Sequence, residues 1–300
     1  MAWVRVLVIA AIAVLLALYV RHLDWHAIRT STADAGIALL VLGTLGNAPL
    51  IWLKAVRLRA LVGGKLGTGK LCGFYVASYA ADNLLMSQAG VGLRVALLRR
   101  EGLPLATAIT VQALEKLLEG IGLALLAVPL LATVELDPRL VTTIRWGLVI
   151  GGAAFALVAA FVLVNRRDLK IFQRIADTAR LLRDPALAAR VLALTMAAWA
   201  VEVAIVWATL AALHLPVASI ATPVLVLVAV NLAALVPGLP ANVGSFEMAA
   251  VLALASCGVT REPALAFAIV YHALHTIPVT IIGVLVGQFA HVAKAGPPRN

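Results

Sequence analysis

The sequence predicts an all-α, polytopic transmembrane helix bundle, with about seven spans and two broken or re-entrant helical segments. Composition is the first indication, because 63% of the 300 residues are hydrophobic and only 13% are charged, whereas soluble domains carry about 25% charged residues. The mean hydropathy of +1.03 agrees. No polar block is long enough for a second domain, so residues 1–300 are expected to form a single integral membrane domain.

The expected spans are apolar runs close to the roughly 20 residues that a helix needs to cross a bilayer. They lie at about 3–20, 35–53, 105–132, 144–164, 191–213, 220–236 and 263–290. The polar stretch 165–190 combines arginines with apolar residues at helical spacing, which predicts an amphipathic helix at the lipid head groups.

Positive charge predicts the orientation. The net charge is +10, from 24 Lys and Arg against 14 Asp and Glu, and basic residues gather in cytoplasmic loops beside anionic lipid. If 72–98 is re-entrant, the basic segments 54–70, 94–101 and 165–190 all lie in the cytoplasm, and 133–143 lies outside. No nucleic-acid partner is expected, because no basic stretch is interleaved with stacking aromatic residues.

Two apolar stretches are interrupted by polar residues, glycine or proline. The residues that interrupt the first are Asp82, Asn83, Ser87, Gln88, Gly90 and Gly92, and those that open the second are Pro237, Gly238, Pro240, Asn242 and Gly244. Irregular backbone at membrane depth must be buried in protein or line a cavity. A pair of broken segments in one chain is typical of a transport site.

Ionisable residues within the spans point to the same interior. Gln112, Glu115 and Glu119 share one helix face, which must turn into the bundle because a carboxylate facing lipid is costly. Glu115 can be a ligand-binding group or part of a buried ion pair, with Lys116 or Arg94, that fixes helix register. Arg94 is a candidate counter-ion or, through its planar guanidinium, a phosphate ligand. Glu119 either belongs to the same site or sits near the membrane interface.

For the other ionisable residues within spans, structural roles are favoured over functional ones. Glu202 stands alone in its span, and His272 with His275 fits bundle histidines better than metal ligands, since no carboxylate pair completes a site. Neither a metal nor a cofactor is therefore expected.

Taken in order, these motifs resemble the lysylphosphatidylglycerol synthase transmembrane-region family, also described as flippase-like, over nearly the whole chain. The residues that carry the resemblance are Asn83, Gly90, Gly92, Arg94, Glu115, Lys116, Glu119, Pro237, Gly238, Gly244 and Glu247. The family includes the membrane half of the synthase and stand-alone proteins. The resemblance implies lipid translocation across the cytoplasmic (inner) membrane of a bacterium, in some members in connection with hopanoid pathways.

The expected function is therefore lipid movement and not enzymatic catalysis. Arg94, Glu115, Glu119 and Glu247, with Asn83 and Lys116, are expected to line a site for an anionic or phosphate-bearing head group. A membrane-embedded lipid-modifying enzyme and an accessory subunit of a lipid-synthesis pathway are the alternatives, although no His-Glu-x-x-His, Gly-x-Ser-x-Gly or Asp-rich motif is present. Gly-x-x-x-Gly pairs at Gly147/Gly151 and Gly283/Gly287 favour contacts within the chain and leave a homodimer open.

Overall fold

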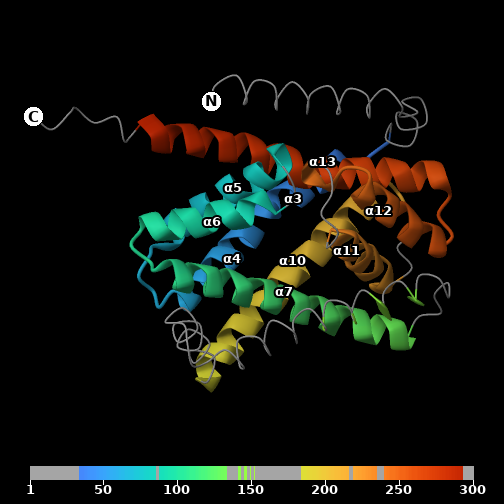
Figure 1. Ribbon diagram of the computed structural model, residues 1–300. Helices are drawn as coiled ribbons and strands as arrows, with labels where there is room; N and C mark the ends of the chain where they lie inside the picture. The colour runs from blue at the N-terminus through green and yellow to red at the C-terminus, as the bar shows by residue number, and fades with distance from the viewer. Residues whose placement is uncertain are drawn as a thin grey trace, which may run out of the picture.

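The computed structural model describes residues 34–85, 88–133, 184–215, 219–234 and 240–292, with isolated positions between 141 and 152 (Figure 1). All regular secondary structure in these residues is helical, which confirms the predicted all-α bundle. The predicted span at 3–20, most of the span at 144–164 and the amphipathic helix up to residue 183 lie outside the described residues.

Long helical stretches form the frame of the bundle. They are α7 (Leu105–Thr133), α10 (Pro185–Ala212), α13 (Arg261–Val292) and the 25-residue stretch made of α3 (Ile37–Leu45) followed by α4 (Asn47–Leu61). Within the described residues, three helical stretches are long and apolar enough to cross a membrane: Ile37–Leu61, Pro185–Ala212 and Arg261–Gly287. The helix α7 has 29 residues, so its length of about 43 Å also exceeds the roughly 30 Å hydrocarbon core, but it carries charged residues.

Two hairpins of shorter helices contain the predicted breaks. The first joins α5 (Thr68–Leu84) to α6 (Ala89–Arg100), and the second joins α11 (Ala221–Ala233) through the 3-10 turn η2 (Pro240–Asn242) to α12 (Ser245–Ser256). At about 1.5 Å per residue, none of these four helices reaches 30 Å. Both breaks are thus confirmed where the chain is described; Pro237 and Gly238 lie outside the described residues.

The position of the first break differs from the prediction. The helix ends at Leu84 and resumes at Ala89, so Gly90 and Gly92 lie in the first turn of α6 and not in the break. Gly90 serves a packing role instead: its N–H donates to Asp82 Oδ1 over 2.7 Å, and a Cβ there would lie 2.2 Å from the Ser78 carbonyl oxygen.

Replacing Gly90 with alanine should therefore loosen the first hairpin. The clash is with backbone oxygen, which cannot rotate away, so we expect a loss of about 1–3 kcal/mol in stability, measured as a lower thermal unfolding midpoint in detergent. Gly92→Ala is the matched control, since a Cβ there meets no atom within 4 Å. Equal midpoints for the two variants would contradict the close approach.

The predicted basic loop at 54–70 is partly wrong. The helix α4 continues to Leu61, and the chain turns only at Gly63 and Gly64, whose φ angles of +71° and +74° favour glycine. Lys54 and Arg57 are consequently helical residues inside the bundle and not members of a loop. Similarly, Pro185–Arg190, predicted as the end of the amphipathic helix, begins α10, which Asp184 caps through the N–H of Ala186.

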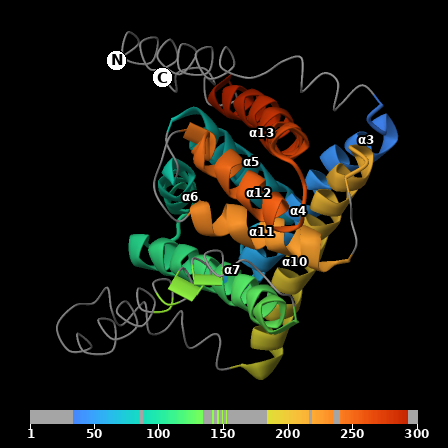
Figure 2. The ribbon, with the colours of Figure 1, turned by 90° about the vertical axis from the view of Figure 1, so that its right-hand side faces the viewer.

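The helices cross so that residues far apart in sequence become neighbours. In Figure 1, α4 and α10 lie between α7 on one side and α13 on the other, and Figure 2 shows α10 along one edge of the bundle. The helix α5 packs on α13 and α11 packs on α7, and Gly283 lies so close to α5 that a Cβ would be 2.4 Å from the Val76 carbonyl oxygen. The buried apolar residues form two separate clusters, one around α4–α7 and one around α10–α13.

Candidate functional site

A network of ion pairs lies where α4, α7 and α10 meet. Arg57 Nη2 is 3.3 Å from Glu115 Oε1 and 3.1 Å from Glu119 Oε1, and Arg57 Nη1 donates to Thr195 Oγ1 over 3.2 Å. The Arg57 side chain is only 1% exposed. A buried charge of this kind is tolerated only with close, hydrogen-bonded partners, and here two carboxylates supply them.

Neighbouring polar groups complete the environment of Glu115. The Tyr75 hydroxyl donates a hydrogen bond to Glu115 Oε1, and Gln112 Nε2 donates to Oε2 over 3.1 Å. Both carboxylate oxygens of Glu115 are thus bonded within the protein. Of the two alternatives drawn from the sequence, this geometry favours a buried ion pair for Glu115, with Arg57 as its cation and not Lys116 or Arg94.

Arg94 is different, because among the described residues no carboxylate lies within ion-pair distance of it. Its guanidinium stacks over the Tyr75 ring, 4.4 Å from the centroid, which is a favourable cation–π arrangement. Arg94 is nevertheless 6% exposed, and its Nε has no hydrogen-bond acceptor. Arg94 is therefore a buried cation without a carboxylate partner among the described residues.

A second chain of charges runs from α4 to α13. Lys54 Nζ is 3.8 Å from Glu202 Oε1 and 3.1 Å from the Tyr79 hydroxyl, and His275 Nε2 is 3.5 Å from Glu202 Oε2. The expectation that Glu202 stands alone is therefore wrong, whereas its contacts are compatible with the structural role favoured for it. Its partners come from α4 and α13, so the residue pattern within a single span could not show them.

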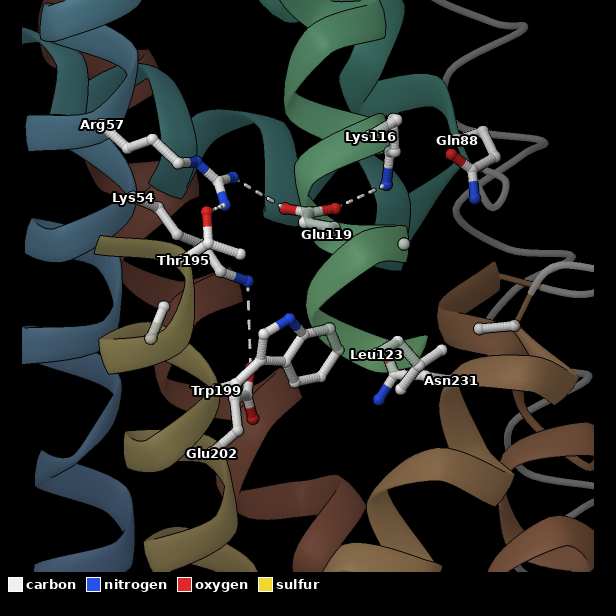
Figure 3. A pocket seen from close by; sticks show the side chains of 13 residues that line it. Lys54, Arg57, Gln88, Lys116, Glu119, Leu123, Thr195, Trp199, Glu202 and Asn231 are labelled. Atoms are coloured by element: carbon white, nitrogen blue, oxygen red, sulfur yellow. Dashed lines mark hydrogen bonds and ion pairs between the residues drawn. The ribbon is translucent and has the colours of Figure 1, made fainter. Parts of the chain in front are cut away.

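Two adjoining pockets open onto these charges. The pocket called here the Arg94 pocket has a volume of about 270 Å³, and the one called the Trp199 pocket has about 170 Å³. They share five lining residues: Lys54, Lys116, Glu119, Glu202 and Asn231. Figure 3 shows the Trp199 pocket, with Lys54 directed at Glu202, and with Glu119 between Arg57 and Lys116.

The pockets lie deep within the bundle. Glu202 is 17 residues from the start of α10 and 10 from its end, or about 26 Å and 15 Å along the axis. His275 is 14 and 17 residues from the ends of α13, or about 21 Å and 26 Å. Large apolar side chains on the outer surfaces of the same helices, such as Trp207, Ile277 and Ile281, are about half exposed, as lipid-facing residues would be.

Both breaks contribute to the site. Gln88, in the first break, and Ala234, at the end of α11 where the second break begins, line the Trp199 pocket. Asn83 lines the Arg94 pocket and ties α5 to α13, since its Nδ2 donates to Thr280 Oγ1 over 2.8 Å. Lys116 is 52% exposed at the mouth and pairs with Glu119 Oε2 over 3.4 Å.

Glu247 is the predicted site residue that the structure places elsewhere. It lines neither pocket. One carboxylate oxygen accepts the Gly244 N–H over 2.6 Å at the start of α12, and the other lies 2.6 Å from His272 Nδ1. Gly244 has a φ of +91°, so glycine suits this helix start. Glu247 and His272 therefore hold α12 against α13 behind the second break.

The sequence profile of one protein family, described as "Lysylphosphatidylglycerol synthase TM region", matches residues 3–283. The chain belongs to this family. No curated protein matches it. As a member of the lysylphosphatidylglycerol synthase TM-region family, it is a membrane protein, which agrees with the long apolar helices.

Within this member of the lysylphosphatidylglycerol synthase TM-region family, the structure unites Asn83, Arg94, Lys116 and Glu119 around the pockets, with Glu115 directly behind them. The structure adds Lys54, Arg57 and Tyr75, which the sequence reasoning did not select, and it gives Glu202 and His275 partners from other helices. One signal could have found Lys54 and Arg57. No glycine or proline separates the apolar run that ends at Leu53 from Arg57, so nothing in the sequence ends the helix before these two residues.

Proposed function

We propose that this protein moves a lipid with an anionic, phosphate-bearing head group between the leaflets of a bacterial cytoplasmic membrane. The observation that carries the proposal is Arg94, a buried cation without a carboxylate partner among the described residues, in the wall of a polar pocket. Arginine suits a phosphate because its fork of N–H donors can bind two oxygens at once. The acyl chains would stay in lipid while the head group enters the pocket.

The surrounding charges support a site that can release the lipid head group as well as bind it. Arg57 is satisfied by two carboxylates and Thr195, so it is not free to hold a ligand strongly. Lys54 and Lys116 each pair with a single carboxylate, at 3.8 and 3.4 Å, where Arg57 pairs with two. The pocket therefore offers one strong anion ligand, Arg94, and two weaker cations next to carboxylates that limit how tightly the head group is held.

Replacing Arg94 with alanine should lower lipid movement at least about tenfold, the effect of losing roughly 1.4 kcal/mol of binding. Arg94→Lys should recover only part, because the two-oxygen contact is lost. The measurement is the rate at which NBD-labelled phosphatidylglycerol becomes accessible to dithionite in proteoliposomes. Arg99→Ala is the matched control, an exposed arginine in the last turn of the same helix.

The same vesicles distinguish the other functional classes. Mass spectrometry of the recovered lipid would reveal a chemical change if the protein is an enzyme, and neither movement nor change would favour an accessory subunit. Equal rates for Arg94→Ala and Arg99→Ala would reject the head-group role of Arg94. A comparison of the lipids of cells with and without the gene identifies the natural substrate.

A further inference from the structure

Two histidines lie near the middle of α13, and their environments differ. His272 is 7% exposed, and its Nδ1 lies 2.6 Å from Glu247 Oε1. His275 Nε2 is buried, has no hydrogen-bond partner among the described residues, and lies 3.5 Å from Glu202 Oε2. That distance exceeds the roughly 2.7–3.2 Å of a hydrogen bond from nitrogen to oxygen. His272 is therefore held by its carboxylate, whereas His275 has an unbonded ring nitrogen beside one.

Of these two histidines, only the second faces the lipid pocket. His275 and Glu202 both line the Arg94 pocket, and His272 lines neither pocket. The Tyr271 ring meets the His275 ring edge-on, with the ring centroids 4.9 Å apart, so the imidazole is held at the pocket wall. An ionisable residue that faces a polar cavity deep within a membrane helix is typical of a proton relay.

The formal charges that line the Arg94 pocket balance when His275 is neutral. The described lining residues include three cations and three carboxylates, namely Lys54, Arg94 and Lys116, and Asp82, Glu119 and Glu202. A phosphodiester head group adds one negative charge, and an uncompensated charge is costly away from water. One further positive charge restores the balance, and a proton on His275 supplies it.

Among the carboxylates of the pocket, Glu202 is the one best placed to stabilise that proton. Glu119 lies within 3.4 Å of two cations, and Asp82 accepts the N–H of Gly90 over 2.7 Å. Glu202, by contrast, has Lys54 at 3.8 Å and His275 at 3.5 Å. Its charge is thus the least neutralised by close partners, and it is directed at the imidazole.

The helices packed on α13 bring no competing group to His275. They are α3, α5, α10 and α12. The helix α3 has no ionisable side chain, and Glu247 of α12 is bonded to His272. From α5, besides Asp82, the Tyr79 hydroxyl lines the pocket, and it accepts a hydrogen bond from Lys54. The remaining neighbour, α10, contributes Glu202 itself.

We infer that a proton travels with the lipid head group, and that His275 beside Glu202 is the site that binds it. This inference rests on the proposed function and adds its coupling ion. The proton leaves water on the more acidic side, binds the lone pair of His275 Nε2 in the tautomer that carries its hydrogen on Nδ1, and returns to water on the other side. While bound, it turns the contact with Glu202 Oε2 into a charge-assisted hydrogen bond after a small approach of the two side chains.

A pH gradient across vesicles tests the inference. Phosphatidylcholine proteoliposomes with NBD-labelled phosphatidylglycerol are kept at about pH 7.5 outside and at about pH 7.5 or 6.0 inside, a range in which histidine changes its charge. Outward movement is the rate at which label from the inner leaflet becomes accessible to dithionite. In a second set, potassium and valinomycin set an inside-negative potential of about 100 mV without a pH gradient, which shifts the distribution of one uncompensated charge about fiftyfold.

For the wild-type protein, we expect the acidic interior to speed outward movement at least about fivefold, because His275 binds its proton there. The potential should change the rate less than about twofold, since a lipid anion and a proton together carry no net charge. His275→Asn should reverse both responses: its movement ignores the pH gradient and rises at least about threefold with the potential, because the lipid now moves as an anion. His275→Gln, a second neutral replacement, should behave in the same way.

His214→Asn is the matched control and should respond as the wild-type protein does. His214 is an exposed histidine just beyond α10 that lines neither pocket, and its φ of +53° is one that asparagine tolerates. Rates are divided by the amount of folded protein. The wild-type measurements need no variant, so they decide about the proton even if a substitution lowers the yield.

Wild-type movement that ignores the pH gradient, or that rises with the potential, would overturn the inference and leave the proposed function standing. If the folded His275 variants keep the wild-type response to the gradient, the proton binds elsewhere and His275 is not its site. If the wild-type protein moves no lipid under any of these conditions, the proposed function fails and this inference fails with it.

Discussion

Replacing Arg57 with alanine should destabilise this protein more than any other single substitution considered for the ion-pair network. Arg57 is the only described cation within 4 Å of Glu115, and it also holds Glu119. Its loss would leave Glu115 buried beside Tyr75 and Gln112 with no positive partner. Breaking a buried pair by removing one member costs about 3–5 kcal/mol, which is a large fraction of the stability of most proteins.

The measurement is the thermal unfolding midpoint and the yield of monodisperse protein in detergent. Arg59→Ala is the matched control, because Arg59 is an exposed arginine in the same helix. Adding Glu115→Gln to Arg57→Ala should restore part of the loss, since it removes the stranded charge but keeps an acceptor for Tyr75. An Arg57→Ala protein as stable as Arg59→Ala would show that the network is not structural.

The bundle and its breaks could be predicted because they depend on local sequence. Long apolar runs specify helices in lipid, and polar residues, glycine and proline interrupt them wherever they occur. The face of Gln112, Glu115 and Glu119 followed from helical spacing alone. The exact break did not, because Gly90 is needed for close packing against Ser78, and a glycine required for packing looks the same in sequence as one required for a turn.

The partners within the site could not be predicted in the same way. Lys54 and Arg57 were assigned to a cytoplasmic loop because charge counting weighs basic residues without knowing where a helix ends. Glu202 appeared alone because its partners, Lys54 and His275, are 148 and 73 positions away (202 from 54, and 275 from 202). Only the crossing of α4, α10 and α13 brings them together.

The described helices also contain an internal repeat, since α12 begins and ends 156 positions after α6 (89 to 245, 100 to 256), and α13 begins 156 positions after α7 (105 to 261). This repeat was hidden for a related reason. At a shift of 156, Glu119 corresponds to His275 and Lys116 to His272, so the equivalent positions keep an ionisable side chain but not the residue type. Sequence comparison scores these exchanges as differences, whereas the backbone preserves the helix boundaries and the turns.

Reversing the ion pair of Lys54 with Glu202 should have the largest effect on transport. Lys54→Glu would place three carboxylates together, with Glu202 and Glu119, and Glu202→Lys would gather cations around Lys54 and Arg57. Each single variant is expected to lose most lipid movement, at least about tenfold, because like charges at this separation repel strongly away from water. The double variant restores an opposite pair and should recover a substantial part, because neighbouring sites couple by about 0.5–3 kcal/mol.

The matched control is the pair of Lys70 with Glu101, which joins α5 to the end of α6 over 2.7 Å but is largely exposed. Surface pairs contribute about 0–1 kcal/mol, so reversing one or both of these residues should leave movement unchanged. Rates are divided by the amount of folded protein in the vesicles, which separates transport from stability. Recovery in the double variant requires that Lys54 and Glu202 act on the head group as a pair. If the double variant is as inactive as the singles while remaining folded, Lys54 and Glu202 do not act as a pair.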